Sequence, residues 1–98
     1  SKPEPAVQLF VNPHRRLAIA QAARLPELAP GRAYQLWFIP RSGKPIASVS
    51  FKVETFGNAL VTNIPVPLGI VLTAAAITEE PDGGSSEPTS PFLLSGTL

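Results

Sequence analysis

Residues 34–53 read YQLWFIPRSGKPIASVSFKV, and this stretch decides the fold. From residue 47 onward, apolar side chains alternate with polar ones, a period of two that indicates a strand with one face in water. Residues 34–39 are apolar except for Gln35, which predicts a central strand covered on both faces. Residues 40–45 place Gly43, which is free to adopt a positive φ, between two prolines. The stretch therefore predicts an antiparallel hairpin.

The period of two recurs on both sides of this hairpin. Two Ala-rich stretches, residues 17–25 and 72–77, could instead be helical, because Ala is the best helix former. The first lacks a good N-cap and the second is shorter than a typical helix, so we predict strands for both. The result is an all-β prediction, a single antiparallel β-sandwich of about seven strands over residues 6–98, with residues 1–5 as a flexible linker arm. The five further strands are expected at residues 7–11, 17–25, 59–64, 70–78 and 92–97.

Composition excludes several classes of protein. The chain has 98 residues, with no Cys, no Met, one His and 12 Pro. Without Cys there are no disulfides, thiolate metal sites or thiol nucleophiles, and one His cannot build a His-based zinc site. No apolar run approaches the ~20 residues that a membrane-spanning helix needs. Because the chain has no Met, either an initiator Met was removed before Ser1 or the chain is a piece of a longer protein. We expect the second, because the start Ser-Lys-Pro-Glu-Pro resembles a linker.

Charge is divided unevenly along the chain. Residues 1–52 contain all 8 Lys and Arg side chains, whereas most of the acidic side chains follow residue 52. The basic residues occur singly or in pairs with little aromatic interleaving, so no nucleic-acid partner is predicted. In a small domain we expect the two halves to interdigitate and largely neutralise each other.

Two further segments carry a family resemblance. Residues 31–40 read GRAYQLWFIP, and residues 78–91 read TEEPDGGSSEPTSP, followed by Leu-Ser-Gly at 94–96. Together they resemble the C-terminal extracytoplasmic domain of the anti-sigma-K factor (RskA-like) family. The chain departs from that pattern at Ser90, where Gly is frequent, and at Glu79, where a less charged residue is common. The matching positions, to which we assign a structural role, are Tyr34, Gln35, Leu36, Trp37, Pro40, Glu80, Pro81, Gly83, Gly84, Ser85, Pro88 and Gly96.

The resemblance implies a bacterial regulator of transcription in three parts. A cytoplasmic segment sequesters a sigma factor, one helix crosses the membrane, and the present domain lies outside, on the periplasmic or outer face. Proteolysis in and near the membrane then releases the sigma factor. We therefore predict a regulatory domain that is not an enzyme, and we expect it to need no metal or cofactor because ligands of suitable spacing are absent. Its sigma factor and membrane partners would act through segments outside this chain, whereas the site proteases are expected to make their first cut in the arm at residues 1–5.

Four acidic side chains, Glu79, Glu80, Asp82 and Glu87, could form a divalent-cation site or a general acid/base pair. Their spacing does not match a calcium loop, and adjacent strand residues point to opposite faces. We favour a solvated turn in which Glu80 caps backbone N–H groups of the bend at residues 83–85.

Three other features have a chemical and a structural interpretation. Residues 83–86 could cradle an anion, but no basic residue follows them and acids flank them. His14 could activate a serine, but its Asn-Pro-His-Arg context favours a surface turn. Trp37 could stack on a ligand, yet its apolar strand favours an anchor buried between two sheets.

Two other functions compete with the regulatory one. The alternative is an extracellular β-sandwich binding or adhesion module for a carbohydrate or protein ligand, and a weaker rival is a small hydrolase. An upstream membrane span of ~20 apolar residues and a cytoplasmic segment would be encoded only for the regulator.

Overall fold

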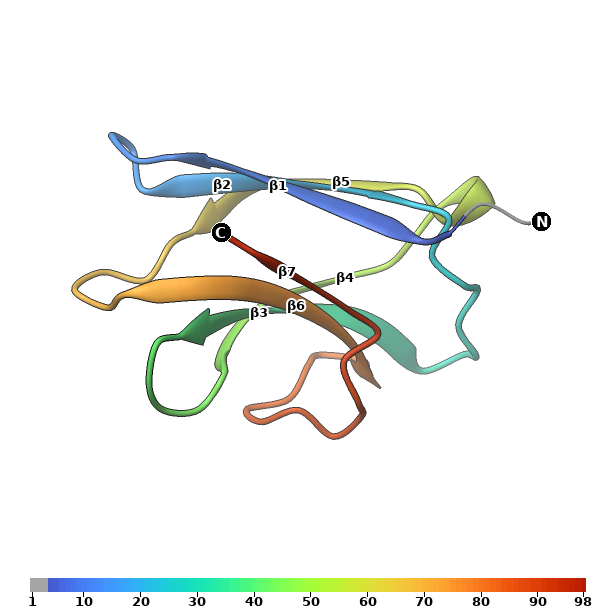
Figure 1. Cartoon of the computed structure of the whole chain (residues 1–98). Helices are drawn as coiled ribbons and strands as arrows, with labels where there is room; N and C mark the ends of the chain where they lie inside the picture. The colour runs from blue at the N-terminus through green and yellow to red at the C-terminus, as the bar shows by residue number, and fades with distance from the viewer. Residues whose placement is uncertain (1–3) are drawn as a thin grey trace.

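The computed structural model describes residues 4–98 and is built almost entirely of strands (Figure 1). One short 3-10 helix, Thr55–Gly57, interrupts them. Within the described residues, no helix has the length and apolarity that a membrane crossing requires. The strands are β1 Ala6–Asn12, β2 Leu17–Ala23, β3 Arg32–Pro40, β4 Ile46–Phe51, β5 Ala59–Pro65, β6 Leu72–Pro81 and β7 Leu94–Thr97.

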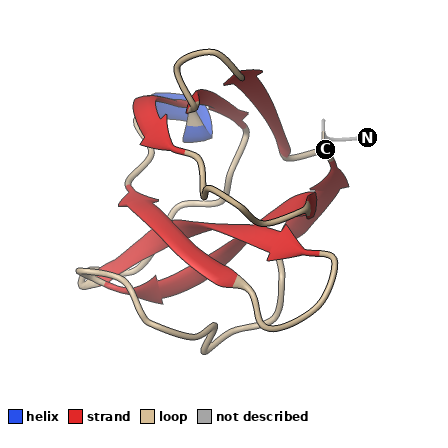
Figure 2. Ribbon diagram, turned by 90° about the vertical axis from the view of Figure 1, so that its left-hand side faces the viewer, coloured by secondary structure: helices blue, strands red, loops and turns tan. Residues whose placement is uncertain are grey.

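The strands form two antiparallel sheets that face each other (Figures 1 and 2). One sheet has the order β1-β2-β5 and the other the order β4-β3-β6-β7. The seven-stranded sandwich is therefore confirmed, and both Ala-rich stretches are strands. The strand expected at residues 70–78 begins later and runs on to Pro81, so that Glu79 and Glu80 belong to it.

The core between the sheets pairs small side chains with large ones. Ala18, Ala20 and Ala22 form the inward row of β2. Their size leaves room for the bulky inward row of β3, whose Tyr34, Leu36 and Phe38 are all buried. The Ala-rich segment is therefore stable as strand β2, because the large side chains of the facing sheet fill the space that its small side chains leave.

Trp37 lies on the opposite face of β3. Its side chain is 0% exposed, as expected for a buried anchor, but the prediction that it packs between the sheets is wrong. Strand geometry sends odd-numbered residues away from the face that holds Tyr34 and Leu36. The odd face, with Gln35 and Trp37, is covered instead by residues 82–93, the connection from β6 to β7 (Figure 1).

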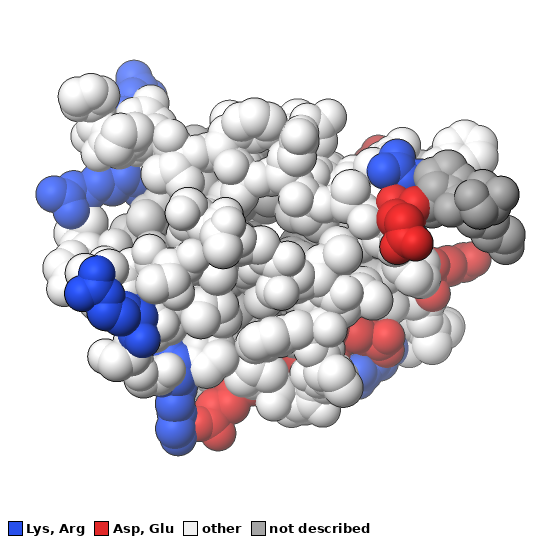
Figure 3. Space-filling model, in the orientation of Figure 1, with Lys and Arg blue, Asp and Glu red and all other residues white. Residues whose placement is uncertain are grey.

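The two halves of the chain are tied together by charge. Three ion pairs, Arg32–Glu79, Lys44–Glu87 and Lys52–Asp82, each join a base of the first half to an acid of the second. Further arginines of residues 4–98 take no part in these pairs, and Figure 3 shows several blue side chains towards one end of the molecule and others beside red side chains at the opposite end. Neutralisation between the halves is thus only partial.

The expected linker arm falls mostly outside the described residues, which begin at Glu4. The carbonyl oxygen of Glu4 accepts a hydrogen bond from Nε of Arg24 (2.7 Å). Strand β1 then starts at Ala6.

Candidate functional site

The two segments that carry the resemblance meet on the outward face of the β4-β3-β6-β7 sheet. There the 82–93 connection lies against β3 and β6 and is held by side chains of both strands. We call this set of contacts the loop clamp; its polar members are Gln35, Trp37, Thr78, Glu80, Ser85 and Thr89.

Gln35 holds the backbone of the connection. Its Nε2 donates to the carbonyl of Ser85 (2.9 Å), and its Oε1 accepts from the N–H of the same residue (2.8 Å). The buried amide thus offers Ser85 one donor and one acceptor, as a neighbouring strand would. The preceding Gly84 has φ +82°, and a Cβ there would lie 3.0 Å from Oε1 of Gln35. A residue with a side chain at position 84 would therefore be strained and would press on the clamp.

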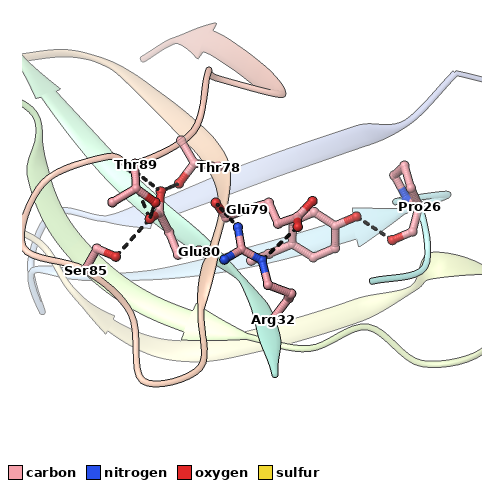
Figure 4. Close-up of polar contacts among 8 residues, drawn as sticks. Pro26, Arg32, Thr78, Glu79, Glu80, Ser85 and Thr89 are labelled. Carbon is pink, nitrogen blue, oxygen red and sulfur yellow. Dashed lines mark hydrogen bonds and ion pairs between the residues drawn. The ribbon is translucent and has the colours of Figure 1, made fainter. Parts of the chain in front are cut away.

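Glu80 is the centre of the clamp and is 0% exposed (Figure 4). Its carboxylate accepts from the hydroxyl of Thr78 (2.6 Å), the hydroxyl of Ser85 (2.8 Å), and both the N–H and the hydroxyl of Thr89. The connection is thereby fixed at two points four residues apart.

Trp37 fixes the direction of the bonds. Its indole Nε1 lies 2.7 Å from Oγ1 of Thr78, and an indole N–H can only donate. Oγ1 of Thr78 must then accept, and its own proton is directed to Glu80. A relay runs from the indole through the hydroxyl to the carboxylate, and within residues 4–98 no buried side-chain polar atom lacks a partner.

The charge of Glu80 is held by neutral donors. None of the three ion pairs found among the described residues includes it. Burial by itself raises the pKa of the Glu80 carboxyl, but the hydrogen bonds from Thr78, Thr89 and Ser85 outweigh burial and hold the pKa below its ordinary value. The carboxylate therefore favours the folded, clamped arrangement at neutral pH.

Acid is expected to destabilise the domain through Glu80. Because the pKa of Glu80 is lowered in the folded state, the carboxyl of the unfolded chain binds a proton first as the pH falls. The contribution of Glu80 to the free energy of unfolding is therefore complete above the ordinary pKa of 4.5, and it is lost as the pH falls through the folded pKa. Thermal midpoints between about pH 7 and about pH 3 should fall more steeply for the unmodified chain than for Glu80→Gln. The exposed Glu27→Gln is the control and should keep the steep dependence. Equal slopes for all three proteins would contradict this role of Glu80.

The other acidic residues do not join Glu80. Glu79 points to the opposite face and pairs with Arg32 (2.9 Å), and Asp82 and Glu87 pair with separate lysines. Across residues 4–98, no three His, Asp or Glu side chains are grouped so that they could hold a metal ion.

The solvated-turn interpretation needs correction, because Glu80 is buried in a strand and binds the Ser85 hydroxyl and Thr89 instead of the backbone of the bend. The sequence did contain a sign of this position: Ala76, Thr78 and Glu80 share one face if the strand continues past residue 78, as its pairing with β3 does.

The remaining signature residues have varied surroundings. Tyr34 and Leu36 face the core; the hydroxyl of Tyr34 donates to the carbonyl of Pro26, and its ring packs 5.9 Å from that of Phe51, measured between centroids. Burial, followed by the charge of Glu79, raises the pKa of Tyr34. Both contacts hold the Tyr34 side chain on the face of β3 that packs against the other sheet.

The prolines and glycines of the signature lie in different kinds of backbone. Pro40 is buried where the register between β3 and β6 shifts, and Pro81 ends β6. Pro88 is half-buried in the 82–93 connection. Gly83 has φ +89°, which suits glycine, whereas nothing in the structure requires glycine at Gly96.

Residues singled out for catalysis or ligand binding have ordinary surroundings. His14 is exposed in the β1–β2 turn, where its backbone N–H donates to Oδ1 of Asn12 (3.1 Å). In the bend at residues 83–84, the N–H of Gly84 donates to the carbonyl of Pro81 (3.0 Å). The indole of Trp37 is covered and cannot stack on a ligand. The contacts of the loop clamp therefore hold the 82–93 connection on the sheet.

Comparison with known proteins gives one finding. The family model described as the C-terminal region of the anti-sigma-K factor rskA matches residues 1–92. Neither the curated proteins nor the solved structures contain a match to the chain.

Proposed function

The chain belongs to the family of anti-sigma-K factor C-terminal domains, and from this premise we propose that it is the extracytoplasmic, signal-responsive part of a membrane-anchored anti-sigma factor. In this proposal its folded state controls proteolysis near the membrane. Loss of that state permits the cut that frees an extracytoplasmic-function sigma factor. The sigma factor, the membrane and the proteases contact segments that precede the domain.

The observation that carries the proposal is the match of residues 1–92 to an anti-sigma factor family. The geometry supports a gating role in particular. Proteases bind substrates as extended chain, and the strands of the sandwich are already paired in two sheets. The longest connection, residues 82–93, would be the natural point of attack, and the loop clamp holds it on the sheet. A folded domain thus resists cleavage and directs a protease to the chain before β1.

A direct grip on the sigma factor is not part of the proposal. Helix-in-groove binding needs an amphipathic helix, and the one helix among the described residues is the three-residue Thr55–Gly57. The purified 98-residue chain should therefore show no affinity for the cognate sigma factor in a titration calorimeter.

Destabilising the domain in the full-length protein is expected to raise sigma-dependent transcription. Trp37→Ala should cost about 3–5 kcal/mol and so increase the unfolded fraction by roughly two to nearly four orders of magnitude. A reporter driven by the sigma factor measures the output, and an immunoblot of the full-length protein measures cleavage. The rise should disappear in a strain that lacks the responsible site protease.

The matched control is Leu60→Ala. Leu60 is 67% exposed on the outward face of β5, so its loss should leave stability, cleavage and transcription unchanged. The proposal fails if the isolated chain binds the sigma factor tightly, or if Trp37→Ala unfolds the domain while cleavage and transcription stay at their original levels.

A further inference from the structure

One flank of the sandwich is open. On the other flank the chain passes from β4 to β5 and so links the two sheets. On the open flank the edge strands β1 and β7 leave an apolar groove of about 510 Å³ between them. Val7, Leu9 and Val11 line one wall, and Leu94 and Leu98 line the other, with Ile77 between them.

Strand β1 has none of the usual protection of a sheet edge. Edge strands generally carry charges, a proline or a bulge, because their free N–H and C=O groups can pair with another strand. The seven residues of β1 read AVQLFVN and include no charge and no proline. Its pairing with β2 is regular from Ala6 to Asn12, so no bulge turns the edge away.

We propose that two copies of this chain associate through their β1 strands, antiparallel and centred on Leu9. The paired strands join two three-stranded sheets into one continuous sheet. The proposal is independent of the proposed function, because it concerns the assembly of the domain and not what the domain controls.

The sequence of β1 is self-complementary in this register. With Leu9 opposite Leu9 of the second copy, Val7 lies opposite Val11, so the row that lines the groove meets an identical row. On the outward face, the exposed Gln8 lies opposite Phe10 of the second copy, and the two Phe10 rings are diagonal neighbours within aromatic reach. Phe10 is 53% exposed in the single chain, which this contact would reduce.

Charge favours the antiparallel direction. Glu4 precedes β1, whereas Arg15 and Arg16 follow it in the β1–β2 turn. The Glu4 end also holds Arg24, so the difference lies in the turn: parallel pairing would bring the Arg15 and Arg16 pairs of the two copies together, whereas antiparallel pairing keeps these pairs apart and brings each towards Glu4 of the other copy. The two-fold axis then stands perpendicular to the sheet, so both β7 strands lie on the same side. The two grooves face each other and each is covered by the second copy.

Charges introduced at the outward positions test the register. In the double variant Gln8→Lys/Phe10→Lys, an introduced ammonium at position 8 faces another at position 10 of the second copy, and the dissociation constant should rise by at least about tenfold. In Gln8→Lys/Phe10→Glu, the ammonium at position 8 faces a carboxylate at position 10, so dimers should persist and weaken as salt is added. Both positions are exposed in the single chain, so circular dichroism should show the same fold for both variants. Sedimentation velocity over a series of concentrations measures the association.

A cysteine at position 9 gives a second test in a chain that has no Cys. Opposed Cβ atoms in an antiparallel pair lie about 4.5–5.5 Å apart, close enough for Leu9→Cys to form a disulfide-linked dimer on mild oxidation. Ile19→Cys, on the neighbouring strand β2 and 41% exposed, is the control and should stay monomeric. The proposal is overturned if the unmodified chain is monomeric at every concentration, if both charge variants dimerise alike, or if Leu9→Cys does not cross-link faster than Ile19→Cys.

Discussion

Replacing Trp37 by alanine is expected to lower the free energy of unfolding by about 3–5 kcal/mol. The indole is 0% exposed, so its removal opens a cavity between the sheet and the 82–93 connection. Thr78 also loses the donor that directs its proton to Glu80. Urea unfolding followed by far-ultraviolet circular dichroism measures the change, because the variant has lost the only Trp of the chain.

Trp37→Phe separates the two contributions. It keeps most of the buried ring but removes the N–H, so the loss should be smaller, about 1–2 kcal/mol. The same cost for both variants would mean that the ring's volume contributes little. A loss below about 1 kcal/mol for Trp37→Ala would show that residues 82–93 do not cover the indole in solution.

Glu80→Gln is expected to cost about 2–4 kcal/mol, although it preserves the shape of the side chain. The carboxylate accepts from Thr78, Ser85 and Thr89, all of which donate. An amide has one accepting oxygen, and its NH₂ group must face at least one of these donors. Four donors surround the carboxylate, and one amide oxygen has lone pairs for only two of them. A hydroxyl that faces the NH₂ group must turn to accept and loses its charge-assisted bond, and the Thr89 N–H cannot turn in this way.

The neighbouring Glu79→Gln is the matched control for this prediction. Glu79 makes a partly exposed ion pair with Arg32 on the opposite face of the strand, and its loss should cost at most about 1 kcal/mol. Urea midpoints followed by Trp37 fluorescence compare the two variants directly. Equal losses for the two substitutions would show that the buried carboxylate is no more important than a surface ion pair.

Much of the fold could be predicted because alternation determines where strands lie. The hairpin at residues 34–53 and the strand at residues 59–64 follow from period two and from turn residues. The face of Trp37 was harder to predict, since β3 is apolar at both odd and even positions. Only Gln35 marked the odd side as different, and a single polar residue did not reveal a second layer over the sheet.

The loop clamp could be predicted as a set of residues but not as a set of contacts. The family resemblance selected Gln35, Trp37, Glu80 and Ser85. Their convergence depends on the path of the 82–93 connection, which brings Ser85 and Thr89 back over the strand that they follow. No local periodicity encodes that path. The extension of β6 to Pro81, which buries Glu80, depends likewise on pairing with β3 across the sheet.

The order of the strands has a consequence for the folding kinetics and for damage to the chain. Central strand β3 pairs with β6, and β2 pairs with β5, so each waits for a partner made some tens of residues later. A topology of this kind folds slowly, in the range of about milliseconds to seconds, and only after nearly all of the chain has been synthesised. A single internal cut between β3 and β5 leaves two pieces, neither of which contains a complete sheet. Such a break would be irreversible, and a domain lost in this way could be replaced only by new synthesis.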